Sequence, residues 1–251
     1  MNTIPKITVV TVTYNCVDVL ENTLESVINQ KYSNVEYIVI DGKSNDGTLH
    51  LINKHKDHIS ILVSEPDKGI FDAMNKAINL ATGDWILFMN AGDTFADDNV
   101  LTNVFSNHIE SNVGVVFGDA YFKRKSGLSL YRGTPFYRNK DKYKGMGICH
   151  QSIFVRADLA KLNPFNLDYK YTADYNMMMS IYNNGYRFLE TNVVISVYDL
   201  TGVSTLHCVD QFNEVYRICG LKRGTILYYK LLIIHKYREL KIKIKNRFLL
   251  V

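Results

Sequence analysis

Two carboxylates in this sequence each follow a strongly apolar segment. Asp41 comes directly after residues 35–40, and Asp93 ends a polar turn that follows residues 84–89. Short apolar runs bounded by turn residues are typical of strands buried on both faces. Ligands of open α/β sheets collect at the carboxyl ends of such strands. We therefore expect Asp41, Asn90 and Asp93 at the edge of a ligand site.

Asp41 is well placed to accept hydrogen bonds from a nucleotide base or ribose, because it ends the second expected strand. No G-x-G-x-x-G or G-x-x-x-x-G-K-[ST] motif follows the first strand, so neither a dinucleotide fold nor a P-loop is indicated. Nucleotide phosphates must then be neutralised in another way. A divalent cation held by Asp93 would do this, and hard oxygen ligands suit Mg²⁺ or Mn²⁺.

The elements that position these residues follow from the apolar pattern. β-Branched and apolar runs predict strands at residues 7–12, 35–40, 59–63 and 84–89. Apolar residues at helical spacing predict helices at residues 17–30, 49–56 and 70–80. Strands that alternate with helices form parallel sheets with right-handed crossovers, so an α/β protein is expected.

The second half of the chain is less regular. Its pattern predicts a helix from residues 97–98 onward, with apolar positions up to Ile109, and a second helix at residues 173–183. Strands are expected at residues 113–117, 151–155 and 186–198, a hairpin at 121–132 and a loop at 133–147.

Four ordered motifs carry a resemblance to a known family. They are VTVTYN at residues 10–15, IDGKSNDGT at 40–48, SEPDKGIFDAMNK at 64–76 and NAGD at 90–93. With them the chain resembles the family 2 glycosyltransferases of the GT-A fold, in the branch met in bacterial capsule, O-antigen and colanic-acid synthesis. The match is dense over residues 7–93 and looser to about residue 204.

The resemblance implies a Rossmann-like, mostly parallel sheet flanked by helices. It places a GT-A domain at residues 1–221, with a nucleotide-sugar half at about 1–95 and an acceptor half at about 96–221. The residues expected at the nucleotide and its phosphates are Thr13, Tyr14, Asn15, Asp41, Asp67, Lys68, Asn75 and Asn90.

The turn at residues 90–93 stands where the family has its D-x-D element. The sequence departs from that pattern, because Asn90 and Gly92 replace two acids and Asp93 is the only strong metal ligand in the turn. A later ligand is common in the fold. Asp199 and His207 are both candidates for it, and the sequence does not choose between them.

Asp174 is the expected catalytic base, because the family places an acid at a helix start such as residues 171–175. One carboxylate would take the proton of an acceptor hydroxyl while that oxygen attacks the anomeric carbon. The metal would stabilise the leaving nucleoside diphosphate. The resemblance thus implies an inverting transfer from a nucleotide sugar, with UDP the family's commonest carrier, to a glycan or lipid-linked glycan.

Structural alternatives stand beside several of these roles. Asp174 can cap its helix, Asp46 and Thr48 can cap another, and Asp72 and Lys76 can form an i,i+4 ion pair. His150 and Gln151 can line the acceptor pocket, or His150 can be an ordinary structural histidine. The altered metal turn also makes a non-catalytic nucleotide-sugar-binding or scaffold protein conceivable, although the intact Asp93 and Asp174 argue against it.

The C-terminal segment at residues 222–251 is strongly basic. Its nine Lys/Arg and one acid give +8, whereas the other 221 residues carry −4. The apolar run at 226–234 contains Lys230 and is too short to span a bilayer, and Lys241, Lys243, Lys245 and Arg247 follow it. Such a basic amphipathic segment is typical of one that lies on an anionic membrane surface. Packing against the body is the alternative, and no motif indicates nucleic-acid binding.

The expected location is the cytoplasm, at the inner face of the cell membrane. The N-terminus has no apolar signal region, and the four cysteines show no C-x-x-C spacing, which favours thiols in a reducing compartment.

Overall fold

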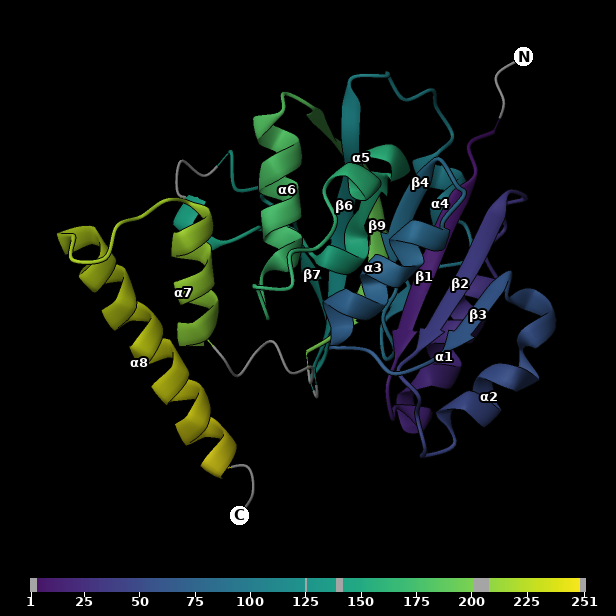
Figure 1. Ribbon diagram of the computed structural model, residues 1–251, viewed down its shortest axis with the longest axis horizontal. Coiled ribbons are helices and arrows are strands. Elements are labelled where there is room, and N and C mark those ends of the chain that lie inside the picture. The colour runs from purple at the N-terminus through teal and green to yellow at the C-terminus, as the bar shows by residue number, and fades with distance from the viewer. Residues whose placement is uncertain (1–3, 125, 139–141, 201–207, 249–251) are drawn as a thin grey trace.

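Nine strands form one sheet in the computed structural model, which describes residues 4–124, 126–138, 142–200 and 208–248 (Figure 1). Their order is β3-β2-β1-β4-β8-β6-β9-β5, and β7 pairs with β6. Within the described residues six of the nine strands run in one direction, because only β5, β7 and β8 pair antiparallel to that set. The predicted mostly parallel α/β architecture is therefore confirmed.

The first half of the chain follows the predicted alternation closely. The strands are β1 (Ile7–Thr13), β2 (Val35–Asp41), β3 (Ile61–Ser64) and β4 (Trp85–Phe88), all parallel. The helices between them are α1 (Val17–Ile28), α2 (Thr48–Lys54) and α3 (Ile70–Leu80). The carboxyl ends of β1, β2 and β3 are in register, since Thr13 pairs with Asp41 and Asp41 with Ser64.

The second half extends the same sheet. Its strands are β5 (Thr94–Phe95), β6 (Val113–Arg124), β7 (Gly127–Tyr131), β8 (Ile153–Arg156) and β9 (Arg187–Asp199). Its helices are α4 (Val100–Val104), α5 (Ala157–Leu162), α6 (Ala173–Asn183), α7 (Cys208–Ile218) and α8 (Ile226–Phe248). The predicted hairpin is present as β6 and β7, with Arg124 opposite Gly127.

Two predicted elements of this half have different bounds. The helix expected to reach Ile109 ends at Val104, because the residues after it turn toward β6. The strand expected at residues 113–117 continues to Arg124, since β9 and then β7 offer it partners along its whole length.

Alternating strand residues build two cores, one on each face of the sheet. One face buries Val10, Ile38 and Phe88 against α3, α5, α6 and α7, and the other buries Val9, Val39 and Leu87 against α1, α2 and α4. At about 25 cal/mol per Å² of buried apolar surface, these two cores supply most of the driving force for folding.

The two C-terminal helices lie side by side at the end of the molecule opposite α2 and β3 (Figure 1). Phe212 and Tyr216 of α7 and Tyr228 of α8 form a small core of their own, joined by Leu231 and Leu232. The predicted packing alternative for the basic segment therefore holds for one face of α8. No helix in the described part of the chain is long and apolar enough to cross a membrane.

Candidate functional site

Asp41 ties together the carboxyl ends of β1, β2 and β3. Its fully buried carboxylate accepts hydrogen bonds from Thr13 Oγ1 (3.1 Å), Ser44 N (3.1 Å), Ser44 Oγ (2.5 Å) and Ser64 Oγ (2.6 Å). Both carboxylate oxygens are thus occupied by the protein. Asp41 therefore holds the strand ends and the loop after β2 together. Its direct contact with a nucleotide base stays a prediction.

The loop after β1 is fastened to the loop after β2. Asn15, which has a positive φ of 45°, donates its N–H to Ser44 Oγ (2.9 Å). Asp46 accepts the N–H of Val17, the first residue of α1 (3.1 Å), and also the N–H and hydroxyl of Thr48 (3.0 and 2.6 Å). Asp46 therefore binds the first N–H of both α1 and α2, although the residues at the capping positions, Cys16 and Gly47, make no side-chain cap hydrogen bond.

Tyr14 and Asp67 meet over the backbone of Gly42. A Cβ atom placed on Gly42 would lie 2.5 Å from Asp67 Oδ2 and 3.2 Å from Tyr14 Cδ2. The Tyr14 side chain is 66% exposed, and Asp67 is held by the N–H of Gly69 at 2.8 Å. An exposed aromatic ring beside a carboxylate suits a planar base, which can stack on the ring and donate N–H groups to the acid.

The start of α3 uses its polar groups internally. Asp72 accepts the N–H of Lys68 (2.9 Å), and Lys76 pairs with Glu65 (2.8 Å). The suggested ion pair between Asp72 and Lys76 is therefore replaced by these two contacts, because the turn before α3 brings closer partners to both side chains. The Lys68 side chain is exposed beside this turn, and its contact with phosphates stays a prediction.

Asn75 clamps the backbone of Phe165. Its Nδ2 donates to the Phe165 carbonyl and its Oδ1 accepts the Phe165 N–H, both at 2.8 Å. Phe165 in turn packs on Phe88 and His150, with ring centroids 5.4 and 5.9 Å apart. The amide is thus mostly engaged within the protein, and nucleotide contact stays a prediction for its remaining N–H.

The turn after β4 is fixed by Thr23 of α1. Thr23 Oγ1 accepts the N–H of Gly92 (3.0 Å) and donates to the carbonyl of Asp93 (2.8 Å), while Asp93 N donates to the Asn90 carbonyl (3.0 Å). Gly92 has a φ of +96°, which disfavours any side chain there. A glycine therefore suits this turn, at a position where the resembled family carries an acid.

Asp93 and Asp199 lie next to each other. Asp93 is 5% exposed, and its Oδ1 accepts the N–H of Asp199 at the end of β9 (3.0 Å). Burial raises the pKa of Asp93 to about 7, the charge of Asp199 adds to the rise, and hydrogen bonds from Asp199 and Gln151 oppose it. A bound cation would offset both the poor solvation of Asp93 and its repulsion by Asp199.

The oxygen atoms of Asn90 and Asp93 are suitable ligands for a divalent cation. Asn90 Oδ1 is buried and has no hydrogen-bond partner among the described residues, and it belongs to the same turn as Asp93. Amide and carboxylate oxygens are the ligands that Mg²⁺ and Mn²⁺ prefer. No group of three His, Cys, Asp or Glu is gathered within the described residues. His207, the alternative later ligand, lies outside them.

Asp174 is the second residue of α6 and faces His150. Its Oδ1 accepts the N–H of Tyr175 (2.8 Å). Burial raises the pKa of Asp174, His150 lowers it, and the charge of Glu214 raises it further. Burial also lowers the pKa of His150, whose ring packs on Phe88 at 5.5 Å. A desolvated carboxylate of raised pKa is a suitable proton acceptor.

Residues 149–151 interact with both Asp93 and Asp174. The Cys149 thiol, whose pKa burial raises to about 12, interacts electrostatically with both Asp93 and Asp174. The Gln151 side chain hydrogen-bonds Asp93, and His150 interacts electrostatically with Asp174. The structure therefore brings together the predicted metal ligands and the predicted base.

Several residues of this site escaped the sequence-based prediction. The missed residues are Thr23, Ser44, Ser64 and Glu214. Ser44 and Ser64 had a signal, because they lie at or just after strand ends that share a sheet edge with Asp41. Thr23 and Glu214 had none, since each lies inside a helix and reaches its partner only through the tertiary fold.

Comparisons with known proteins agree with the architecture. The model of the family described as "Glycosyl transferase family 2" matches residues 8–171. A PGL/p-HBAD biosynthesis glycosyltransferase of Mycobacterium bovis is 30% identical over 187 residues, which are 72% of this chain and 71% of that protein. The UDP-Glc:alpha-D-GlcNAc-diphosphoundecaprenol beta-1,3-glucosyltransferase WfaP of Escherichia coli is 26% identical, with 84% of this chain and 83% of WfaP covered.

Solved structures show the same fold. S. aureus TarS 1–349 in complex with UDP aligns with a TM-score of 0.67 at 19% identity, over 85% of this chain and 64% of TarS 1–349, so this chain spans just under two thirds of that protein. The mannosyltransferase PcManGT of Pyrobaculum calidifontis, in complex with GDP-Man and Mn²⁺, aligns with a TM-score of 0.68 at 18% identity, over 94% and 70%. With the family model covering more than half of its length, the chain belongs to glycosyl transferase family 2 and is a glycosyltransferase.

Proposed function

We propose that this glycosyltransferase moves a sugar, with inversion, from a UDP-sugar to a hydroxyl of a glycan or lipid-linked glycan in cell-surface polysaccharide synthesis. The observation that carries the proposal is that residues 149–151 interact with both acids: Gln151 hydrogen-bonds Asp93, which also binds the Asp199 N–H, and Cys149 and His150 interact electrostatically with Asp174. WfaP, whose name states a UDP-sugar donor and a lipid diphosphate acceptor, supports the substrate classes.

The nucleotide would lie along the carboxyl ends of β1 to β3. Tyr14 offers a ring for stacking, Asp67 accepts N–H groups of the base, and the backbone near Thr13 and Asn15 is fixed through Asp41 and its serines. Asp41 acts here by holding the loops, and Lys68 would supply a positive charge to the phosphates. The exposed ring and the rigid loops together form a preorganised surface for a nucleotide.

Asn90, Asp93 and Asp199 would hold a Mn²⁺ or Mg²⁺ ion, which when bound supplies positive charge to the leaving diphosphate. PcManGT, a solved structure that contains Mn²⁺, supports this choice. The protein's own part is to keep these oxygens poorly solvated, because burial of Asp93 strengthens its attraction for a cation.

Asp174 would accept the proton of the attacking hydroxyl. Burial raises its pKa, which suits this task, while His150 acts on the same carboxylate in the opposite direction. Because the attack displaces the diphosphate in one step, the enzyme needs no nucleophile of its own.

The test measures UDP release from UDP-glucose and UDP-GlcNAc with Mn²⁺ in the full-length protein. Asp93→Ala is expected to abolish Mn²⁺-dependent turnover and Mn²⁺-dependent UDP binding. Asp174→Ala is expected to retain UDP binding and to lower kcat by about 10²- to 10⁴-fold. Asp57→Ala changes an exposed acid outside the site and serves as the matched control. Unchanged turnover in both site variants would refute the mechanism.

We also propose that α8 lies on an anionic membrane surface at the inner face of the cell membrane. The exposed residues Ile226, Tyr229, Ile233, Tyr237 and Leu240 recur at helical spacing, so they form one stripe, and the exposed Lys230, Lys236 and Lys241 lie beside it. An apolar stripe flanked by cations suits the headgroup region of a bilayer. The side chains of residues 243–248 lie outside the described ones.

A further inference from the structure

Glu214 on α7 binds the loop that leads into α6 through hydrogen bonds. Its Oε1 accepts the N–H of Lys170 (2.8 Å), and its Oε2 accepts the N–H of Tyr171, the N–H of Thr172 and the Thr172 hydroxyl, each at 2.9 Å. The Glu214 side chain comes from 42 residues further along the chain and is buried with Thr172. A buried carboxylate with four donors is a strong, directional anchor.

The anchored residues stand directly before the base. Thr172 precedes Ala173, the first residue of α6, and Asp174 is the second. Fixing the N–H groups of residues 170–172 therefore fixes where α6 begins and how its first turn is oriented. A shift of about 1 Å at a reacting group can cost on the order of 10²-fold in rate.

Arg217 of α7 and Cys219, which directly follows that helix, contact the same region. Cys219 Sγ lies 3.4 Å from the hydroxyl of Tyr175, and Arg217 lies over the Tyr169 ring at 5.0 Å and donates to the Asp168 carbonyl. These contacts are weaker or more exposed than those of Glu214. They show that α7 and the residue after it contact the segment around Asp174 at further points besides Glu214.

We propose that Glu214 is a positioning residue for catalysis, which places Asp174 by binding residues 170–172 and sets the electrostatic environment of the base. The proposal rests on Asp174 being the base, as argued above. Three groups from different elements act electrostatically around Asp174: Glu214 on α7, and His150 and Cys149 on the segment before β8. Glu214 is the one whose charge raises the pKa of Asp174.

Two effects follow for the near-isosteric variant Glu214→Gln. An amide has one oxygen in place of two, so at least one donor of residues 170–172 loses its acceptor. The loss of a negative charge also lowers the pKa of Asp174. The acidic limb of the kcat–pH profile should therefore move to lower pH, and kcat at pH 8 should fall by at least about tenfold, with KM for the nucleotide sugar changed by less than about twofold.

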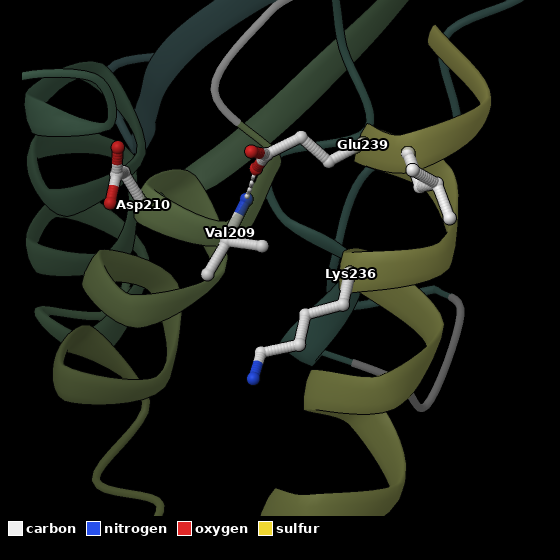
Figure 2. A pocket seen from close by; sticks show the side chains of 5 residues that line it. Val209, Asp210, Lys236 and Glu239 are labelled. Carbon is white, nitrogen blue, oxygen red and sulfur yellow. Dashed lines mark hydrogen bonds between the residues drawn. The ribbon is translucent and has the colours of Figure 1, made fainter. Parts of the chain in front are cut away.

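Glu239→Gln is the matched control. Glu239 of α8 accepts the N–H of Val209 at the start of α7 (3.1 Å), so it is also a carboxylate bound to a backbone N–H of an interhelical contact (Figure 2). In Figure 2 it points toward Val209, and Asp210 and Lys236 line the same pocket. Glu239→Gln should lower stability modestly and leave the kcat–pH profile as in the wild type.

The experiment measures UDP release from UDP-glucose or UDP-GlcNAc, whichever the full chain turns over with Mn²⁺, at pH 5.5 to 9 for wild type, Glu214→Gln, Glu239→Gln and Asp174→Ala. Hydrogen exchange of the peptide spanning residues 166–176 is followed in parallel. The proposal predicts faster exchange in this peptide and a shifted acidic limb for Glu214→Gln alone.

A wild-type pH profile and kcat in Glu214→Gln, together with an inactive Asp174→Ala, would overturn this proposal and leave the proposed base intact. Full turnover in Asp174→Ala would instead overturn the proposed function. If Glu214→Gln does not fold, Thr172→Val removes one donor to the same carboxylate and keeps the charge. It should lower kcat by about two- to fivefold without moving the acidic limb, and an unchanged kcat would refute the positioning role.

Discussion

At the scale of single residues, the raised pKa of Asp93 ties stability to pH. Its folded pKa of about 7 lies above the unfolded value of 3.8, so the protonated form is favoured in the fold. The stabilisation of the fold that follows from this raised pKa is complete below about pH 4 and is lost as the pH rises through 7. Asp93→Asn stays neutral, so without metal it should melt higher than the wild type at pH 8, by roughly 5 °C.

Melting curves in EDTA at pH 5 and pH 8 check this, and the gap between variant and wild type should widen with pH. Addition of Mn²⁺ should raise the melting temperature of the wild type but not of Asp93→Asn, because only a site that binds the ion in the folded state is stabilised by it. A variant less stable than the wild type at pH 8 would contradict the assignment of the shift to burial.

Gly42 offers a second test, directed at the proposed base-binding surface. In Gly42→Ala the new Cβ would displace Asp67 Oδ2 and crowd the Tyr14 ring. Because the displaced atom ends a flexible side chain, stability should change by less than about 1 kcal/mol. KM for the UDP-sugar should rise by about five- to tenfold, while kcat stays near the wild-type value.

Initial-rate kinetics measure this split. Gly133→Ala is the matched control, since the nearest atom to its new Cβ is 3.5 Å away. An unchanged KM in Gly42→Ala would show that Tyr14 and Asp67 do not contact the donor.

At the scale of elements, the sequence predicted the first half of the fold well and the second half partly. β1, β2, β4 and α3 were predictable because their apolar periodicity is strong and turn residues bound them. The extension of β6 to Arg124 was not, since it depends on partners far along the chain. The hydrogen bonds between Asn75 and Phe165 could not be predicted for the same reason, because the two residues are 90 positions apart. The turn at Asp93, in contrast, could be located from the strand that precedes it.

Glu36 joins three elements and gives a prediction at this scale. Its buried carboxylate accepts Lys6 Nζ (2.8 Å) and Thr8 Oγ1 (2.7 Å) from the edge of β1, and Thr82 N (2.8 Å) from the turn before β4. Burial alone would raise its pKa, but the hydrogen bonds from Lys6, Thr82 and Thr8 outweigh burial and lower the pKa to about 2.

Since the folded pKa lies below the unfolded value of 4.5, the stabilisation is present above pH 4.5 and is lost as pH falls toward 2. Glu36→Gln should therefore cost about 3 kcal/mol at pH 7 and progressively less below pH 4.5 in urea unfolding. Glu65→Gln, at an exposed ion pair with Lys76, should cost less than about 1 kcal/mol. A cost for Glu36→Gln that does not depend on pH would refute the assignment.

At the scale of the whole molecule, charge and apolar exposure are unevenly distributed. The acidic body carries the sheet and the site, and the basic C-terminal residues lie at the opposite end from α2 and β3 (Figure 1). α8 packs on α7 through one face, and α7 holds the loop before Asp174 through Glu214. On the proposed function, a membrane surface that binds α8 would therefore be linked through α7 to the loop before the proposed base, to which a lipid-linked acceptor would present its hydroxyl.

The exposed stripe of α8 allows a test that spares this packing. Ile233 and Tyr237 are 67% and 57% exposed, so Ile233→Asp with Tyr237→Asp should leave the fold intact. Each change removes apolar contact and adds a negative charge beside anionic lipid, so sedimentation with phosphatidylserine-containing liposomes should fall by at least about tenfold. Leu162→Asp, at a 76% exposed position on α5, should bind like the wild type. Donor hydrolysis without lipid should be the same in the double variant and the wild type, because the stripe points away from α7. Undiminished liposome binding of the double variant would show that this face of α8 does not contact the membrane.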